Sequence, residues 1–239
     1  MELVPRILNV GVPVQARIWL VTVLVILNGC SDVNRIRQGA EDGNAISQYK
    51  LGTMYVDGDG TASDIEEGIT WLTKSADAGV VEAQIKLGSL YIEGGVVAKD
   101  YRTGAEWLRR AADQGHSEAQ TDLAMLYYLG QGVPQNYPEA MRLFQAAAAQ
   151  RHVIAQFRLA EIYNEGKGVT RDLVAAHVWA NLAAAQGHRE ALILRDVVAA
   201  RLSPEDIVEA QRQARRHVEA AGLVSTARPG EQEQTAPVR

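Results

Sequence analysis

The chain has 239 residues, of which 47% are hydrophobic and only 6% aromatic, so it can bury a core that closely packed helices fill better than a sheet. Its formal charge of −5 and the absence of a basic run exclude a typical nucleic-acid binder, because phosphate contact needs clustered lysine and arginine. The presence of a single cysteine excludes an internal disulfide and a multi-cysteine metal site.

The first predicted element is an apolar run near the N-terminus. Residues 18–27 read IWLVTVLVIL, and the leader before them carries Arg6 and Arg17. A run of this length is shorter than the roughly 20 residues that span a bilayer, but it fits the apolar part of a secretory signal. We therefore predict that residues 1–29 form a signal peptide.

The only cysteine, Cys30, follows this run in the sequence Leu27-Asn28-Gly29-Cys30. This segment resembles the lipobox of bacterial lipoproteins, although Asn28 departs from the usual small or apolar residue. The resemblance implies cleavage before Cys30 and lipidation of its sulfur, and the absence of an aspartate at the next position implies the outer membrane, on its periplasmic side. An ordinary signal with a chance cysteine would instead give a periplasmic or secreted protein. A misassigned start would give a cytosolic adaptor.

Residues 30–43 are expected to form a short linker and half of a repeat, since Ala40 and Gly43 lie 36 residues before Ala76 and Gly79. The full repeat then runs through four copies without insertion, at residues 44–79, 80–115, 116–151 and 152–187. Self-similarity at such a period is typical of a solenoid. The in-phase leucine, tyrosine and tryptophan columns, which we expect to form the core, are Leu51, Leu87, Leu123, Leu159, Tyr55, Tyr91, Tyr127, Tyr163, Trp71, Trp107 and Trp179.

Each copy is predicted to contain two helices. In the first helix Ala83, Leu87 and Tyr91 are four residues apart and therefore share one face. A loop with paired glycines follows, and an Asp or Asn then stands where a helix N-cap belongs. The second helix ends at a glycine, which suits a left-handed position. The third copy has Arg151 there instead, so either Arg151 takes a positive φ and stores strain of about 1 kcal/mol, or that joint differs. The second copy has Gly94-Gly95-Val96 in its loop, so its turn is expected to differ.

This pattern, A-x-x-x-L-G-x-x-Y followed by A-x-x-W-x-x-x-A-A-x-x-G, resembles the Sel-one-like repeat, a relative of the tetratricopeptide repeat. The resemblance implies an all-α fold, a right-handed α-α superhelical solenoid of helix-turn-helix repeats. It also implies a monomeric scaffold that binds a protein or peptide and needs no cofactor. A disulfide-rich branch of these proteins has been linked to β-lactam binding or hydrolysis. That activity is not carried over, because the cysteine pairs of that branch are absent from this sequence.

After the repeats, residues 188–222 are predicted to form C-terminal capping helices. Ser203 is placed as an N-cap, with Pro204 in the first turn and Asp206 closing the capping box. The last helix is expected to run to about Ala221 and to stop at Gly222. Residues 223–239 are polar and lack an apolar pattern, which predicts a disordered tail.

The sequence offers few candidates for chemistry. His116, His152 and His188 occupy one repeat column, but helices pack about 8–10 Å apart while a zinc ligand lies about 2 Å from the metal. We therefore expect no metal site, and interpret these histidines as polar residues that open the first helices. The sequence contains no G-x-S-x-G, no H-E-x-x-H and no phosphate loop, so no catalytic residue is predicted.

The concave face of such a solenoid is the candidate binding surface. Side chains at spacing i, i+4, i+7 on the first helices would line it: Tyr49, Thr53, Val56, Ile85, Ser89, Ile92, Thr121, Met125, Tyr128, Phe157, Glu161 and Asn164. Their mixed apolar and aromatic character suits a peptide or protein partner. Two alternatives remain open: some of these residues could fill the packing between repeats, and the groove could serve a cell-wall-directed hydrolase or a β-lactam-binding protein.

Overall fold

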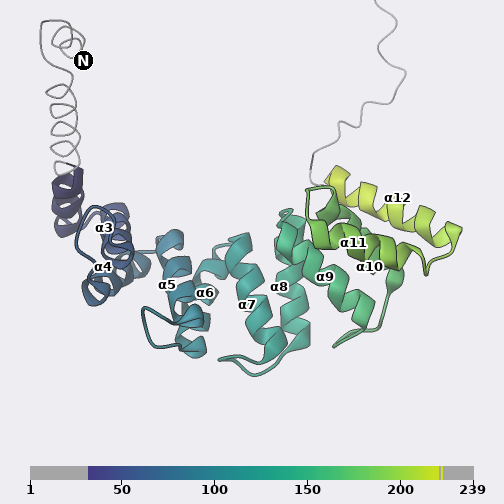
Figure 1. Ribbon diagram of the computed structural model, residues 1–239, viewed down its shortest axis with the longest axis horizontal. Coiled ribbons are helices and arrows are strands. Elements are labelled where there is room, and N and C mark those ends of the chain that lie inside the picture. Colours follow the sequence, from purple (N-terminus) through teal and green to yellow (C-terminus); the bar gives the residue numbers. More distant parts are fainter. Residues whose placement is uncertain (1–31, 221, 223–239) are drawn as a thin grey trace, which may run out of the picture. The chain divides into compact units, whose positions relative to one another are not determined.

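The computed structural model describes residues 32–220 and 222, and every regular element among them is a helix (Figure 1). Residues 32–41 are helical and precede the labelled helices. These are α3 (Ala45–Asp57), α4 (Ile65–Asp77), α5 (Val81–Glu93), α6 (Tyr101–Asp113), α7 (Ser117–Leu129), α8 (Tyr137–Ala149), α9 (Val153–Glu165), α10 (Leu173–Ala184), α11 (Arg189–Ala199) and α12 (Pro204–Ala220). The predicted signal peptide, Cys30 and the predicted tail lie outside the described residues.

The helices belong to two compact units, one that ends at Asp100 and one that begins at Tyr101. In the N-terminal unit α3 packs on α4 and α4 on α5, and in the C-terminal unit each helix from α6 to α11 packs on the next. The first helices of the repeats are α3, α5, α7 and α9, and the second helices are α4, α6, α8 and α10. The prediction of an all-helical chain built from 36-residue helix pairs is confirmed.

Side chains and glycines fix the ends of the helices as the sequence predicts. The side-chain oxygens of Asp64, Asn136 and Asp172 accept hydrogen bonds from backbone N–H groups three residues later, at 2.9–3.1 Å. Such a cap contributes about 1 kcal/mol. Gly94 ends α5 with φ 73° and ψ −157°, whereas the glycines that end α3, α7 and α9 are left-handed helical. The turn of the second copy therefore differs, as expected.

Small residues let the two helices of a pair approach each other closely. A Cβ placed on Gly52 would lie 2.8 Å from Cγ of Leu72, closer than real Cβ atoms come. The neighbouring leucine column is sealed, since Leu51, Leu87 and Leu159 have no exposed surface. The glycine in the middle of α3 is therefore explained by packing, which outweighs its cost of roughly 1 kcal/mol in helix propensity.

A column of buried glutamines joins each second helix to the next first helix, and the sequence analysis missed it. The column consists of Gln48, Gln84, Gln120 and Gln156, and each Nε2 donates to a backbone carbonyl eight residues earlier at 3.0–3.4 Å. These carbonyls lie in the last turn of the preceding helix, and each also accepts the backbone N–H three residues later at 2.9–3.1 Å, so the glutamine is a second donor. The glutamine column also bonds to a further glutamine, because Gln150 donates to Oε1 of Gln120 at 3.0 Å. The signal was present in the sequence as four glutamines at the 36-residue period.

Arg151 takes the positive φ that its column requires. Its φ is 64°, while the glycines at the equivalent positions, Gly43, Gly79, Gly115 and Gly187, have φ between 86° and 92°. Arg151 is the one non-glycine residue with positive φ among the described residues. A left-handed conformation costs an L-residue about 1 kcal/mol, so this joint stores strain.

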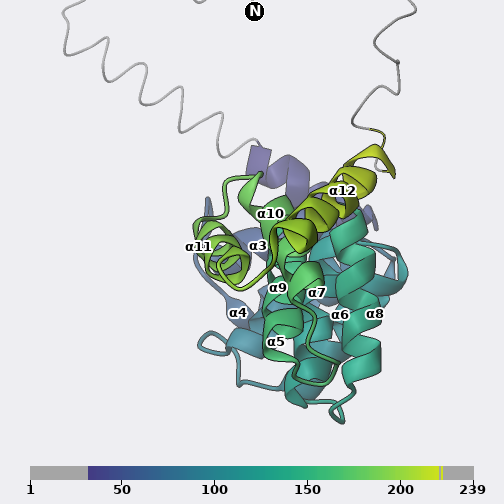
Figure 2. The same ribbon diagram turned by 90° about the vertical axis from the view of Figure 1, so that its right-hand side faces the viewer.

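The chain after the fourth repeat does not form another regular pair. α11 packs on α10, and α12 also packs on α10, across which it lies in Figure 2. Ala210 and Ala214 of α12 are buried at this contact, and the His217 ring lies 4.6 Å from the Trp179 ring. The predicted cap of α12 is present, since Ser203 Oγ accepts from the Asp206 N–H at 3.1 Å. The predicted terminal helices thus cover one end of the C-terminal unit.

We expect the free energy of unfolding of the Gln120→Leu variant to be about 1–3 kcal/mol lower than that of the wild type. The reason is that a buried carbonyl loses its side-chain donor while the side-chain volume stays similar. Denaturant unfolding of the full chain measures this difference. The matched control is Gln145→Leu, since Gln145 is exposed on α8 and its replacement should change stability by less than about 0.5 kcal/mol. Equal stability of the two variants would contradict a structural role for the glutamine column.

Stability should also fall on acidification, and His177 should account for part of the fall. This side chain is 5% exposed, and burial, assisted by the charge of Arg195, lowers its pKa while Asp196 opposes the shift. Burial likewise lowers the pKa of His152 and of His217. Since the unfolded chain titrates near 6.5, it binds more protons than the folded chain as the pH falls through that value, and folding weakens.

The His177→Leu variant should therefore lose less stability between pH 7.5 and pH 5 than the wild type does. Urea unfolding at several pH values measures how steeply the free energy of unfolding of each protein changes with pH. A variant whose stability falls as steeply as that of the wild type would show that His177 does not contribute.

Candidate functional site

The candidate surface of the N-terminal unit lies on α3 and α5. Five of the six side chains expected there are half-buried: Tyr49, Thr53, Ile85, Ser89 and Ile92. The sixth, Val56, is buried, because it packs against Gly68 of α4. This surface thus combines aromatic, aliphatic and hydroxyl groups on two first helices, with the sealed leucine column beside it.

The candidate surface of the C-terminal unit lies on α7 and α9. Met125, Phe157, Glu161 and Asn164 are half-buried there. Phe157 stacks on the His188 ring at 4.5 Å, and Arg158 pairs with Glu161 at 2.7 Å. The other two expected side chains, Thr121 and Tyr128, are buried and are not available at this surface.

Thr121 and Tyr128 belong to the packing, so the expectation that they line a groove needs correction. Thr121 is 2% exposed, and its hydroxyl donates to the Ser117 carbonyl at 2.8 Å and lies 2.9 Å from Nδ1 of His152. The ring of Tyr128 meets the Tyr137 ring edge-on at 5.3 Å. Together with Val56, these residues fill contacts between helices, which was the alternative left open for this surface.

The structure adds two residues that the sequence analysis did not include. Ile193 and Val197 of α11 lie 36 residues after Phe157 and Glu161, so they continue the same two columns beyond the last repeat. They are 64% and 53% exposed, while Ala191 and Val198 of the same helix are buried. α12 packs on α10 and leaves this side of α11 uncovered. Extending the 36-residue period past residue 187 would have identified both residues.

The tyrosine column, Trp71 and Trp107 are only partly buried, which corrects the expectation that they lie in the core. Trp179 is buried, as expected. The hydroxyl of Tyr127 accepts a hydrogen bond from Arg109 at 3.1 Å, and Tyr55 accepts one from Arg37 at 3.3 Å. Lys74 lies over the Trp71 ring, with its Nζ 3.9 Å from the ring centroid. These rings have one apolar side against the helices and one side that meets a polar or cationic group. The leucine column is the sealed part of the core.

The histidine column opens the first helices, as interpreted from the sequence. His116, His152 and His188 are the N-cap residues of α7, α9 and α11, and Nδ1 of His188 accepts from the Ala191 N–H at 3.2 Å. Within the described part of the chain, no three His, Cys, Asp or Glu side chains gather closely enough to hold a metal ion. None of the helices among residues 32–220 combines the length and the apolar character required to cross a bilayer.

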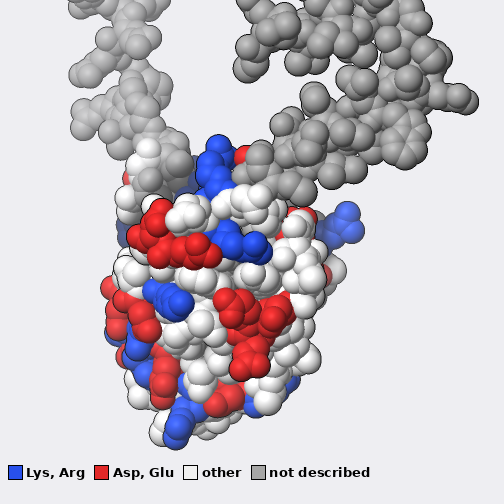
Figure 3. Space-filling model, turned by 90° about the vertical axis from the view of Figure 1, so that its left-hand side faces the viewer, with Lys and Arg blue, Asp and Glu red and all other residues white. Residues whose placement is uncertain are grey.

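The surface charge is mixed. The face drawn in Figure 3 carries acidic groups in small patches, with lysine and arginine between them, and its basic groups do not form a continuous field. In the N-terminal unit, exposed carboxylates surround the α3–α4 loop at Asp57, Asp59 and Asp64, and Lys86 pairs with Asp57 at 3.1 Å. Charge therefore does not mark out the candidate surfaces, and their apolar groups are the feature that does.

Comparison with solved structures finds the same fold in other proteins. A protective antigen present in uropathogenic Escherichia coli strains, which displays an SLR fold, matches with 30% identity and a TM-score of 0.72, over 87% of this chain and 44% of that one. A Sel1 repeat protein from Oxalobacter formigenes matches with 27% identity and a TM-score of 0.64, over 79% of each chain. The chain thus spans less than half the length of the first of these proteins. A comparison with curated proteins found no match.

The family model of the Sel1 repeat matches residues 45–80, 81–116, 117–152 and 153–188. These four repeats cover more than half of the chain, and their limits enclose the helix pairs from α3 to α10. The buried leucines, the close-approach glycine and the capped second helices are the physical basis of this match. The chain therefore belongs to the Sel1 repeat family.

Proposed function

We propose that this Sel1 repeat protein is a non-catalytic scaffold that binds a peptide or protein partner on its first helices. The observation that carries the proposal is the contrast between two neighbouring columns. The leucines at Leu51 and Leu87 are sealed, while apolar side chains beside them, such as Tyr49 and Ile85, keep part of their surface in water. Partly exposed apolar groups on rigid helices suit the apolar face of a partner segment.

The end of the C-terminal unit offers the most apolar part of this surface. Met125 and Phe157 are half-buried on α7 and α9, and Ile193 and Val197 of α11 extend the same columns with more exposure. A partner segment that presents apolar side chains along one face would cover all four. The ion pair between Arg158 and Glu161 lies beside these residues and provides a polar rim.

We also propose that Cys30 carries a lipid that tethers the protein to the bacterial cell envelope, with the periplasmic side of the outer membrane favoured. The support is the sequence Leu27-Asn28-Gly29-Cys30 after the apolar run of residues 18–27. Residues 32–41 are helical and therefore span only about 15 Å, at 1.5 Å per residue. A lipid at Cys30 would hold the repeats near the bilayer surface.

Partner binding can be tested with substitutions that do not disturb the fold. A photo-crosslinking side chain at position 157 of the full chain should capture one partner. Combining Ile193→Asp with Val197→Asp should weaken that capture by about tenfold or more, since buried apolar anchors carry much of the energy of an interface. Both side chains are exposed, so stability should change little.

The matched control for this experiment is Val208→Asp, because Val208 is 54% exposed on α12 and lies in neither column. The control should keep the crosslink. If the paired substitution leaves the adduct unchanged, or if the control removes it equally, the first-helix surface is not the binding site.

The lipid anchor has its own test. Cells that express the wild type in the presence of a labelled fatty acid should incorporate the label, and the Cys30→Ala variant should lose both the label and its membrane association, because each buried CH₂ group contributes about 0.8 kcal/mol. The control is Ser31→Ala, which retains the cysteine. Unchanged membrane association of Cys30→Ala would refute the tether.

A further inference from the structure

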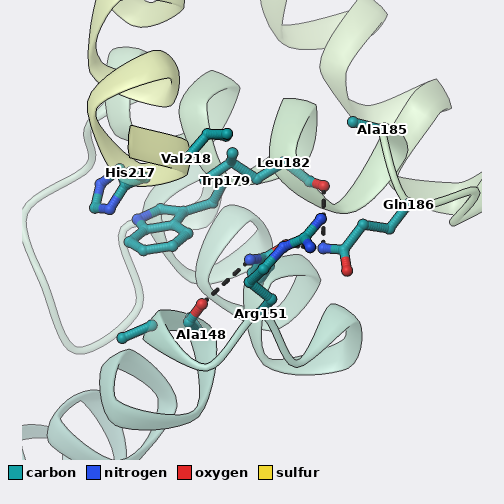
Figure 4. Close-up of a pocket in the computed structure, with 10 residues that line it drawn as sticks. Ala148, Arg151, Trp179, Leu182, Ala185, Gln186, His217 and Val218 are labelled. Atoms are coloured by element: carbon teal, nitrogen blue, oxygen red, sulfur yellow. Dashed lines mark hydrogen bonds between the residues drawn. The ribbon is translucent and has the colours of Figure 1, made fainter. Parts of the chain in front are cut away.

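A small pocket lies where α12 packs on α10 in the C-terminal unit (Figure 4). Its volume is about 60 Å³, and the apolar side chains of Trp179, Leu182 and Val218 form much of its wall. Val218 and His217 come from the last turn of α12, which has no counterpart within the repeats. The pocket is therefore a product of the terminal helix and is separate from the first-helix surface.

Arg151 lines the same pocket and stands at the strained position between α8 and α9. At the equivalent glycines Gly43, Gly79, Gly115 and Gly187, an added Cβ would meet no atom within 4 Å. The column thus has room for a side chain, and only the backbone conformation disfavours one. A side chain that persists in a disfavoured conformation points to a role for that side chain, because glycine would fold more easily there.

No partner among the described residues explains the position of the Arg151 guanidinium. Among the described residues it takes part in no ion pair and donates no side-chain hydrogen bond, and no carboxylate lines the pocket. Figure 4 shows its side chain extending between Trp179 and Gln186. The Gln186 amide is already engaged, since it donates to Oε1 of Gln156 at 2.8 Å. Burial lowers the pKa of His217, which leaves Arg151 as the charged group of the pocket at neutral pH.

We propose that this pocket binds the C-terminal residue of a peptide chain whose last side chain is small and aliphatic. The terminal carboxylate would accept paired hydrogen bonds from the Arg151 guanidinium, the geometry that arginine favours for carboxylates. The aliphatic side chain would lie against Trp179 and Leu182. About 60 Å³ is a few times the space that one water needs, which suits a side chain of a few carbon atoms and excludes an aromatic ring.

The chemistry of the pocket favours a chain terminus over an acidic side chain within a chain. An internal Asp or Glu would bring a carboxylate but would leave the apolar wall at Trp179 uncovered. A C-terminal residue carries its carboxylate and its side chain on the same carbon, so one residue satisfies both the cation and the apolar wall. This site does not depend on the proposed function of the first helices.

The test is calorimetric titration of the full chain with acetyl-Gly-Gly-Val that has a free C-terminal carboxylate. Saturable binding at millimolar peptide is expected, and the same peptide as a C-terminal amide should bind about tenfold more weakly or worse. Acetyl-Gly-Asp-Gly-amide separates an internal carboxylate from a terminal one, and acetyl-Gly-Gly-Trp tests the size limit. Both should bind more weakly than the valine acid.

The informative variant is Arg151→Gly, since glycine adopts this φ without strain and the protein should unfold at the same or a higher temperature. Its affinity for the valine acid should fall about tenfold or more. Arg189→Ala, an exposed arginine of α11 outside the pocket, should bind as the wild type does. The proposal is overturned if the acid does not bind, if the amide binds equally, or if Arg151→Gly retains full affinity.

Discussion

The structure depends on satisfying the backbone carbonyls where one helix pair meets the next. A second helix ends in carbonyls that have no partner within the helix, and the following first helix covers them and excludes water. The buried glutamines, such as Gln84 and Gln156, supply a second donor to these carbonyls from inside the contact, in addition to the backbone N–H of the turn. Because a hydrogen bond requires a specific geometry, this interaction also constrains how α5 packs on α4 and how α9 packs on α8.

This way of building a repeat decides what kind of function the surface can serve. The polar groups in the joints are engaged with the backbone, and the histidine column begins helices, so neither set is assembled into a reactive centre in the described part of the chain. The side chains that remain partly in water on the first helices include apolar and aromatic ones, such as Phe157, beside hydroxyl groups and the ion-paired Glu161. Partly exposed apolar groups of this kind suit contact with another molecule, which is the basis of the proposed scaffold role.

The end of the C-terminal unit departs from the repeat in two connected ways. α12 packs on α10, so α11 lacks the second helix that every other first helix in its unit has beside it, and Ile193 and Val197 remain exposed. The same placement of α12 closes the pocket beside Trp179 and Arg151. One change in the direction of the chain, at Ser203, thus creates both the apolar extension of the candidate surface and a separate cavity lined by Arg151.

The sequence by itself determined the helix pairs, their period and most of their ends, because these follow from local chemistry: Leu87 and Tyr91 four residues apart, Asp64 before a helix and glycine after one. For Arg151 the column left two alternatives, a positive φ or a different joint, and the structure has the positive φ. Which side chains of the first helices face water is visible only in the folded chain. Thr121 is buried and Ile193 is exposed although they stand in one column, since exposure depends on which helix from elsewhere in the chain covers each position. The period of a sequence reports which residues share a face of one helix. The course of α12 depends instead on contacts between residues distant in sequence, and it leaves one face of α11 open and closes the pocket on α10.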